Sequence, residues 1–259
     1  MLFLYDGTFE GLLTALAEAL VQAPADAEFA SAALAQPSLW QRSFRVDPSP
    51  ARAEAFFRRV REEISPGAAG RLASCWAAEK PRIEPILLEY VRLGLQHGAA
   101  VDRLHTSAAV RQVALTAARV GGEIHRLHGL LRFRHLADGS FYGPIAPDAN
   151  IAPAVAWHFR QRLAAEKWVI HDTRRGLGVF WDRQRLEVLD IAGAPGGTSG
   201  SDPALETTGM LHEDETLYQD LWRTYYRTVA IPERRNLELQ RRCMPRRYWP
   251  FLVERPDAG

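Results

Sequence analysis

The sequence predicts an α+β protein with a mainly helical N-terminal half, a central antiparallel sheet and C-terminal helices. Three observations support this fold class. Apolar residues recur at helical spacing in several segments up to Leu127. Between Leu130 and Ile191 the spacing of apolar residues shortens to two, which is typical of strands. Helical periodicity then returns near Glu213, after a segment rich in Gly, Ser, Pro and Thr.

The N-terminal half begins with a strand that leads into a helix. Leu2 to Tyr5 form a short apolar strand, and Thr8 is placed to cap the helix that follows. Residues 23–50 show few periodic signals, so we expect a long loop there. Four further helices are predicted from their apolar faces and from Pro and Gly at their ends, at residues 50–64, 68–78, 81–96 and 108–127.

The central region predicts a sheet interrupted by one helix. Residues 130–145 alternate apolar and polar side chains around Ala137-Asp138-Gly139, as in a hairpin. A helix starts at Asn150 or Pro153. Three short apolar runs follow as a meander, at residues 168–172, 176–182 and 185–191. The predicted order is therefore strand-strand-helix-strand-strand-strand.

Four segments are predicted along the chain, although a single domain could contain them all. They are an N-terminal strand and helical region at 1–98, a central α+β region at 99–191, a flexible loop at 192–211, and basic aromatic helices at 212–259. In the last segment we expect Leu217, Leu221 and Val229 to pack the first helix on the core, and Asn236 to cap a second, short helix.

Composition bounds the class of protein. With 259 residues, 47% hydrophobic and 24% charged, the chain has the composition of a globular protein. Cys75 and Cys243 lie far apart without metal-ligand spacing, and we expect neither a metal nor a cofactor. The N-terminus lacks the basic region of a signal peptide, and no apolar run is long enough to span a bilayer. We therefore expect a soluble cytoplasmic protein with no membrane partner.

The C-terminal segment carries the strongest functional signal. Between Arg223 and Arg247 it holds eight arginines against two acids, although the formal net charge of the whole chain is only +1. Guanidinium groups beside aromatic rings are typical of proteins that bind single-stranded nucleic acid. The alternative is that the arginines are solvated or paired with acids such as Asp220. The candidate contact residues here are Arg223, Arg227, Arg234, Arg235, Arg246, Arg247, Tyr226 and Trp249.

A second candidate lies where the helix at 108–127 meets the first strand. Glu123 and His125 could act as acid–base groups on a phosphate or a base, and Gly129 could let a ligand approach closely. Arg126 and Arg132 add cations for nucleic acid. The alternative is an ion-pair ladder of Arg119, Glu123 and Arg126 at helical spacing.

His171 and Asp172 form a third candidate, at the end of a predicted strand and followed by Arg175. The two side chains could be catalytic or hold a metal. Adjacent strand residues point to opposite faces, however, so they cannot both reach one ion without a bulge. A role for Asp172 in capping the following turn is the simpler interpretation. Arg175 joins the candidate nucleic-acid contacts.

Five blocks of the sequence resemble a bacterial family that is assigned to DNA repair or DNA metabolism and is linked to a radical-SAM protein. They are YDGTFEGLL, EIHRLHGLLRF, DANIAPAVAWHFRQR, KWVIHDTRRG and LWRTYYRTVAIPERRNLELQRRCMPRRYW, in that order. Many members carry a fused uracil-DNA glycosylase domain. This chain stops at Gly259, so we expect any base excision to come from a separate glycosylase.

The resemblance implies DNA and a radical-SAM protein as partners, and it leaves the chemistry open. Our first hypothesis is an accessory protein of DNA repair that binds nucleic acid. One alternative is an enzyme that processes a nucleotide or a base, with Glu123, His125 and His171 as acid–base groups. Another is a scaffold that binds its protein partner without affinity for DNA, since Trp, Tyr and Arg are also typical of protein interfaces.

Overall fold

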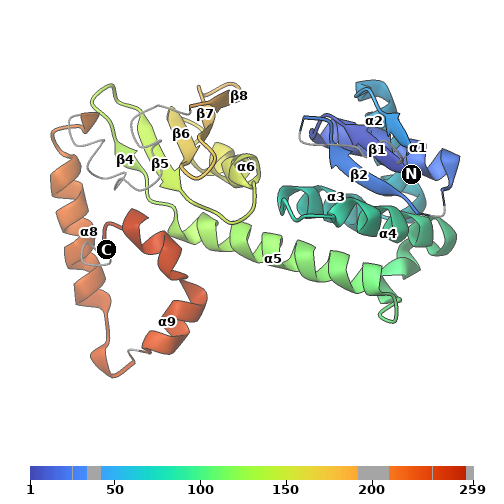
Figure 1. Cartoon of the computed structure of the whole chain (residues 1–259). Coiled ribbons are helices and arrows are strands. Elements are labelled where there is room, and N and C mark those ends of the chain that lie inside the picture. Colours follow the sequence, from blue (N-terminus) through green and yellow to red (C-terminus); the bar gives the residue numbers. More distant parts are fainter. Residues whose placement is uncertain (25, 34–41, 192–209, 235, 255–259) are drawn as a thin grey trace. The chain divides into compact units, whose positions relative to one another are not determined.

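The computed structural model describes residues 1–24, 26–33, 42–191, 210–234 and 236–254. The chain divides into two compact units, unit 1 at Met1–Gly121 and unit 2 at Gly122–Gly259. Both mix helices and strands, which confirms the α+β class (Figure 1). The four segments inferred from the sequence stay a prediction.

Unit 1 contains a three-stranded parallel sheet in the order β2-β1-β3. Its strands are β1 (Leu2–Tyr5), β2 (Glu28–Ser31) and β3 (Ser43–Arg45). The prediction of a loop throughout residues 23–50 was therefore wrong. Strands of three and four residues are too short to show a period, and they are specified by contacts with β1. The ring of Phe3, for example, stacks on that of Phe29 with centroids 5.3 Å apart.

The predicted helices of unit 1 are confirmed with small shifts at their ends. The side chain of Thr8 accepts a hydrogen bond from the backbone N–H of Gly11 at 3.0 Å, as an N-cap does. Ser49 and Ser65 cap the next two α-helices in the same way. The helices are α1 (Phe9–Gln22), α2 (Pro50–Arg59), the π-helix η1 (Val60–Ile64), α3 (Pro66–Ala77), α4 (Ile83–His97) and the 3-10 helix η2 (Gly98–Arg103).

Helix α5 (Ala108–Leu130) crosses the boundary between the units. Its predicted apolar stripe is buried at Val113, Val120 and Leu127. The helix continues beyond its expected end, so Gly129 lies in its last turn. A methyl group at Gly129 would meet no atom within 4 Å among the described residues. No described backbone approaches this glycine closely, and close approach of a ligand there stays a prediction.

Unit 2 contains a five-stranded sheet in the order β4-β5-β6-β7-β8. Its elements are β4 (Arg134–His135), β5 (Phe141–Ile145), α6 (Ala152–Arg162), β6 (Trp168–Asp172), β7 (Leu177–Trp181) and β8 (Leu186–Asp190). The predicted element order is confirmed. The sheet is mixed rather than wholly antiparallel, because β5 and β6 are parallel. Helix α6 connects them and carries the chain back to the starting end of the sheet.

The C-terminal part of unit 2 is helical, as predicted. Its elements are α8 (Glu215–Val229), η4 (Pro232–Arg234), α9 (Leu237–Cys243) and η5 (Arg246–Phe251). The side chain of Asn236 caps α9 by accepting from the N–H of Leu239 at 2.8 Å. Most of the predicted loop at 192–211 lies outside the described residues. Its last residue, Leu211, forms an isolated β-bridge with Leu136.

Helix α8 does not pack on the core through its apolar stripe, so that expectation was wrong. Leu217, Leu221, Tyr225 and Val229 are each more than half exposed. The opposite, polar edge of α8 binds the rest of unit 2 instead. One of the hydrogen bonds that hold α8 against the rest of unit 2 runs from the guanidinium of Arg223 to the carbonyl of Val253, at 2.8 Å.

Candidate nucleic-acid interface

Glu123 lies at the meeting point of three segments of unit 2. The residue is 4% exposed, and its carboxylate accepts four hydrogen bonds. Two come from the backbone N–H groups of Asp148 at 2.9 Å and Ala149 at 3.1 Å, in the loop between β5 and α6. The other two come from η5, from the guanidinium of Arg247 at 2.8 Å and the hydroxyl of Tyr248 at 2.6 Å.

These donors determine the protonation of Glu123. Burial alone raises the pKa of its carboxyl group. The hydrogen bonds from Tyr248, Asp148, Arg247 and Ala149 outweigh burial and leave the pKa below its ordinary value. Burial and the bond to Glu123 raise the pKa of Tyr248 to about 12, so its hydroxyl remains a donor. Glu123 is therefore an ionised carboxylate whose oxygens are occupied by the protein itself.

The other residues of the candidate site at the end of α5 do not gather around Glu123. The ladder of Arg119, Glu123 and Arg126 does not form, because Glu123 faces inward and pairs with Arg247. His125 is exposed. The Nε atom of Arg126 is buried and has no hydrogen-bond partner among the described residues. Glu123 and His125 thus do not form the expected acid–base pair.

Asp172 and His171 are fully buried and belong to two different contacts. The carboxylate of Asp172 accepts from the backbone N–H groups of Arg174 at 3.1 Å and Arg175 at 3.3 Å, so it caps the turn between β6 and β7. Burial raises its pKa more than the ion pair with Arg175 at 2.9 Å lowers it. His171 is bonded through Nδ1 to the hydroxyl of Tyr142 at 2.8 Å. Within the described ranges, no three His, Cys, Asp or Glu side chains gather as metal ligands.

An arginine cluster, formed by Arg174, Arg175 and Arg247, surrounds Asp148 near Glu123. Two of its guanidinium groups pair with the exposed carboxylate of Asp148, from Arg174 at 3.2 Å and from Arg247 at 3.1 Å. Arg175 donates to the backbone carbonyl of Asp148 at 2.7 Å. Arg174, Asp148 and Tyr248 were not among the predicted contact residues, although each stands inside one of the five sequence blocks. The cluster mainly holds the loop after β5 in place.

Two more of the predicted contact residues are engaged in structural bonds. Arg132 forms an ion pair with Glu254 at 2.6 Å and lies over the ring of Trp222 at 5.3 Å. The pKa of Glu254 is lowered because the bonds from Arg132 outweigh the effect of burial. Arg223 pairs with Asp220 at 2.7 Å in addition to its bond to Val253. These cations have partners within the protein.

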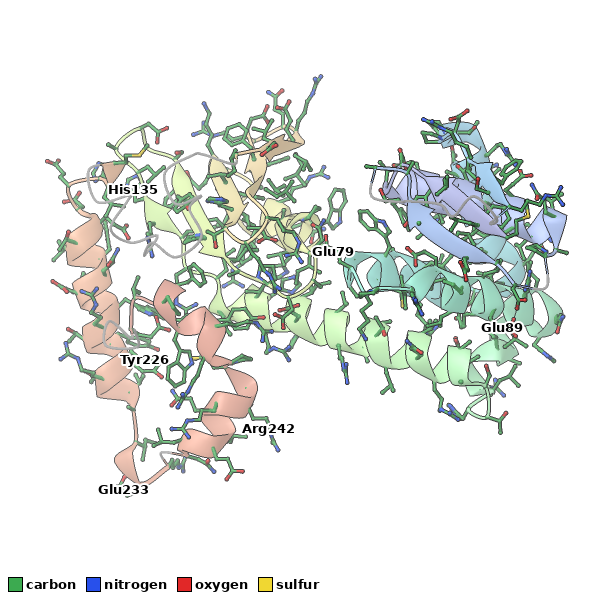
Figure 2. The ribbon with its side chains drawn as sticks, viewed as in Figure 1. Glu79, Glu89, His135, Tyr226, Glu233 and Arg242 are labelled. Atoms are coloured by element: carbon green, nitrogen blue, oxygen red, sulfur yellow. The ribbon has the colours of Figure 1, made fainter. Side chains whose placement is uncertain are left out.

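The remaining cations form a separate group, which we call the arm arginines. All five are exposed, and among the described residues none has a carboxylate within ion-pair distance. Within the described part of the chain, Arg227 bonds to a carbonyl of its own helix at 3.3 Å, and Arg246 lies over the ring of Trp249 at 5.7 Å. Figure 2 shows Arg242 on α9 and Tyr226 on α8. The arm arginines are Arg227, Arg234, Arg241, Arg242 and Arg246.

Three of the arm arginines, Arg227, Arg234 and Arg246, are predicted contact residues. Arg241 and Arg242 belong to the same run of eight arginines but were not chosen as contacts. Arg235 lies outside the described residues. The two predicted stacking residues are half-buried. Tyr226 accepts a hydrogen bond from Gln240 at 3.4 Å, and Trp249 donates to the carbonyl of Met244 at 2.9 Å. Both rings therefore connect the C-terminal helices α8, η4, α9 and η5, which we call the arm, and leave part of their own surface open.

A family model described as a domain of unknown function, DUF4130, matches residues 81–254. The chain belongs to the DUF4130 family. The match includes α5, the sheet of unit 2 and the arm, and so covers every candidate residue discussed above. No curated protein and no solved structure gave a significant match to this DUF4130 chain. Across the part of the chain that the structure describes, no helix combines the length and the apolar character needed to cross a membrane.

Proposed function

We propose that this DUF4130 protein binds nucleic acid through the arm arginines and acts in DNA repair or DNA metabolism beside a radical-SAM protein. One observation carries the binding proposal. In unit 2, Arg132, Arg175, Arg223 and Arg247 are paired with carboxylates, whereas the five arm arginines are exposed without such partners among the described residues. The link to repair and to the radical-SAM protein rests on the resemblance of the five sequence blocks.

The chemistry of the arm suits a phosphate backbone. A guanidinium group can donate two parallel hydrogen bonds to a phosphate, and several along one strand release counterions on binding. The rings of Tyr226 and Trp249 lie within the same helices and offer surfaces for bases, each stack contributing about 1 to 3 kcal/mol. We therefore expect single-stranded DNA to bind with strong salt dependence.

The test is a double substitution, Arg241→Ala with Arg242→Ala, measured by fluorescence anisotropy on a labelled single strand. If both guanidiniums contact phosphates, the slope of log affinity against log salt should flatten by about 1.4. Arg61→Ala with Arg103→Ala is a matched control, because both of these arginines are exposed and the pair removes the same charge from unit 1. An unchanged slope in the arm variant, or an equal change in the control, would contradict the proposal.

The exposed apolar stripe of α8 favours a second candidate, a scaffold that binds a protein partner without affinity for DNA. Leu217 and Leu221 are 57% and 56% exposed, and aliphatic side chains contribute little to nucleic-acid contacts. In this case Leu217→Asp with Leu221→Asp should abolish co-purification with the radical-SAM protein, and the unsubstituted chain should not bind DNA. The enzyme alternative has less support, because the oxygens of Glu123 are occupied and His171 is buried.

A further inference from the structure

The exposed apolar stripe of α8 has a regular spacing. Its members recur every four residues, and each is more than half exposed: Leu217, Leu221, Tyr225 and Val229. Side chains at this spacing form one continuous ridge along a helix, and helices commonly pack on one another through such ridges. The stripe is symmetric in sequence, because its midpoint is position 223 and two of its members lie on each side.

Two charged residues beside the stripe share this midpoint. Asp220 and Arg227 are seven residues apart on α8, about 20° short of two full helical turns, so both lie on the same side of the stripe. The side chain of Asp220 is 64% exposed and bonds to Arg223 at 2.7 Å. Its carboxylate oxygens can accept further bonds. Arg227 is exposed as well.

This symmetry is the one that an antiparallel pair of identical helices requires. A two-fold axis makes residue i of one copy contact residue j of the other, while j contacts i. With the axis at position 223, Leu221 of one copy faces Tyr225 of the other, and their outer neighbours in the stripe also meet.

The charges are complementary in the same arrangement. Equivalent sides of two helices adjoin when the helices are antiparallel, so Asp220 of each copy lies beside Arg227 of the other. A parallel pair brings opposite sides together and forms neither ion pair. The same chain therefore provides both the apolar ridge and the matching charges.

We propose that two copies of this chain form a dimer by packing their α8 helices antiparallel through the apolar stripe, with two ion pairs between Asp220 and Arg227. The inference goes beyond the proposed function and names a second copy, rather than a different protein, as the partner of the stripe. One helix face buries a limited area, so we expect a dissociation constant of about 1 to 100 µM. Arg227 is then an interface residue, and the nucleic-acid test on Arg241 and Arg242 is independent of it.

The first experiment measures the mass of the chain by sedimentation velocity, without nucleic acid, in a concentration series up to about 500 µM. We expect the mass to rise from that of one chain toward twice that value. Leu221→Ser removes an apolar side chain from the centre of the interface and should keep the chain monomeric throughout. Leu115→Ser is the matched control, because Leu115 is an equally exposed leucine on α5, and it should dimerise like the unsubstituted chain.

Two results of this experiment would overturn the inference. One is an unsubstituted chain that stays monomeric at every concentration, which would assign the stripe to a different protein. The other is dimerisation of Leu221→Ser that is as tight as that of Leu115→Ser. Leu221 is more than half exposed in the single chain, so the serine variant should keep the fold of the monomer.

An exchange of charges tests the antiparallel arrangement. Asp220→Arg alone, or Arg227→Asp alone, places like charges at both contacts and should weaken dimerisation at least about fivefold. An equimolar mixture of these two variants restores opposite charges at both contacts and should recover the association, which also shows that both variants are folded. Single variants that dimerise like the unsubstituted chain, or a mixture that associates no more tightly than either variant alone, would also overturn the inference.

Discussion

Glu123 accepts its hydrogen bonds from residues that lie 25 and 26 positions away in the β5–α6 loop and 124 and 125 positions away in η5. The sequence shows only its helical neighbours, Arg119 and Arg126, and so suggests a surface ladder. Those neighbours are not its partners, because burial of α5 turns Glu123 inward. No local pattern could identify donors that reach it through the tertiary fold.

Replacement of this carboxylate should destabilise unit 2. Glu123→Gln keeps the shape but places an NH₂ group among four donors, so at least one buried bond is lost and two donors face each other. We expect the free energy of unfolding to fall by about 2 to 3 kcal/mol in urea titrations. Glu62→Gln, at an exposed position of η1, is the control and should change it by less than about 0.5 kcal/mol.

The same residue should contribute to the acid sensitivity of the fold. The pKa of Glu123 is lower in the folded chain than in the unfolded chain. Its stabilising contribution is therefore complete above the unfolded pKa of about 4.3 and is lost as pH falls through the folded pKa. The difference in unfolding free energy between the unsubstituted chain and Glu123→Gln should shrink from pH 7 to pH 3. A difference that grows toward acid would contradict this assignment. The raised pKa of Asp172 acts in both chains and cancels.

At the scale of elements, α8 shows a reversed amphipathic arrangement. Its polar edge contacts unit 2 and its apolar stripe is exposed. Periodicity predicts which residues share a face of a helix, but it does not predict which face the fold covers. Bonds from Trp222 to Glu254 at 3.1 Å and from His135 to Glu215 at 2.9 Å decide this, and they connect segments far apart in the chain.

Substitutions in the exposed apolar stripe of α8 should therefore have little effect on the free energy of unfolding. Leu217→Ser and Leu221→Ser should each change the free energy of unfolding by less than about 0.5 kcal/mol. Leu127→Ala, at a position of α5 that is 2% exposed, should cost about 2 to 5 kcal/mol in the same assay. If the two serine variants lose as much stability as Leu127→Ala, the stripe is packed in solution.

Strong local signals allowed most elements of the fold to be predicted. The bounds of β6 and the cap at Asn236 follow from apolar runs and from a side chain that can satisfy a helix end. The short strands β2 and β3 were missed because their pairing with β1 is non-local. The parallel pairing of β5 and β6 was missed because alternation alone does not specify strand direction.

At the scale of the whole molecule, each unit contains one cysteine, and the two thiols differ in their accessibility. Cys75 in unit 1 is fully buried, and burial raises the pKa of its thiol to about 11. Cys243 on α9 in unit 2 is exposed. A thiol-specific reagent added to the native chain should modify Cys243 in a fast phase and Cys75 in a much slower one, because Cys75 must first become accessible.

Single substitutions assign these phases. Cys243→Ser should remove the fast phase and leave the slow phase, and Cys75→Ser should do the reverse. Modification of both thiols at one rate would show that unit 1 does not protect Cys75 under native conditions. The slow phase therefore follows the opening of unit 1 around Cys75, and the fast phase of the exposed Cys243 is an internal reference for the reagent.

The span between Glu123 and Tyr248 also matters during biosynthesis. The two residues are separated by 125 positions, which a ribosome takes roughly 6 to 25 s to translate at 5 to 20 residues per second. Throughout that interval the carboxylate lacks both of its side-chain donors, and its burial would be unfavourable. Unit 1 can complete its core cotranslationally, whereas unit 2 can close its polar network only after residues 247 and 248 have left the exit tunnel.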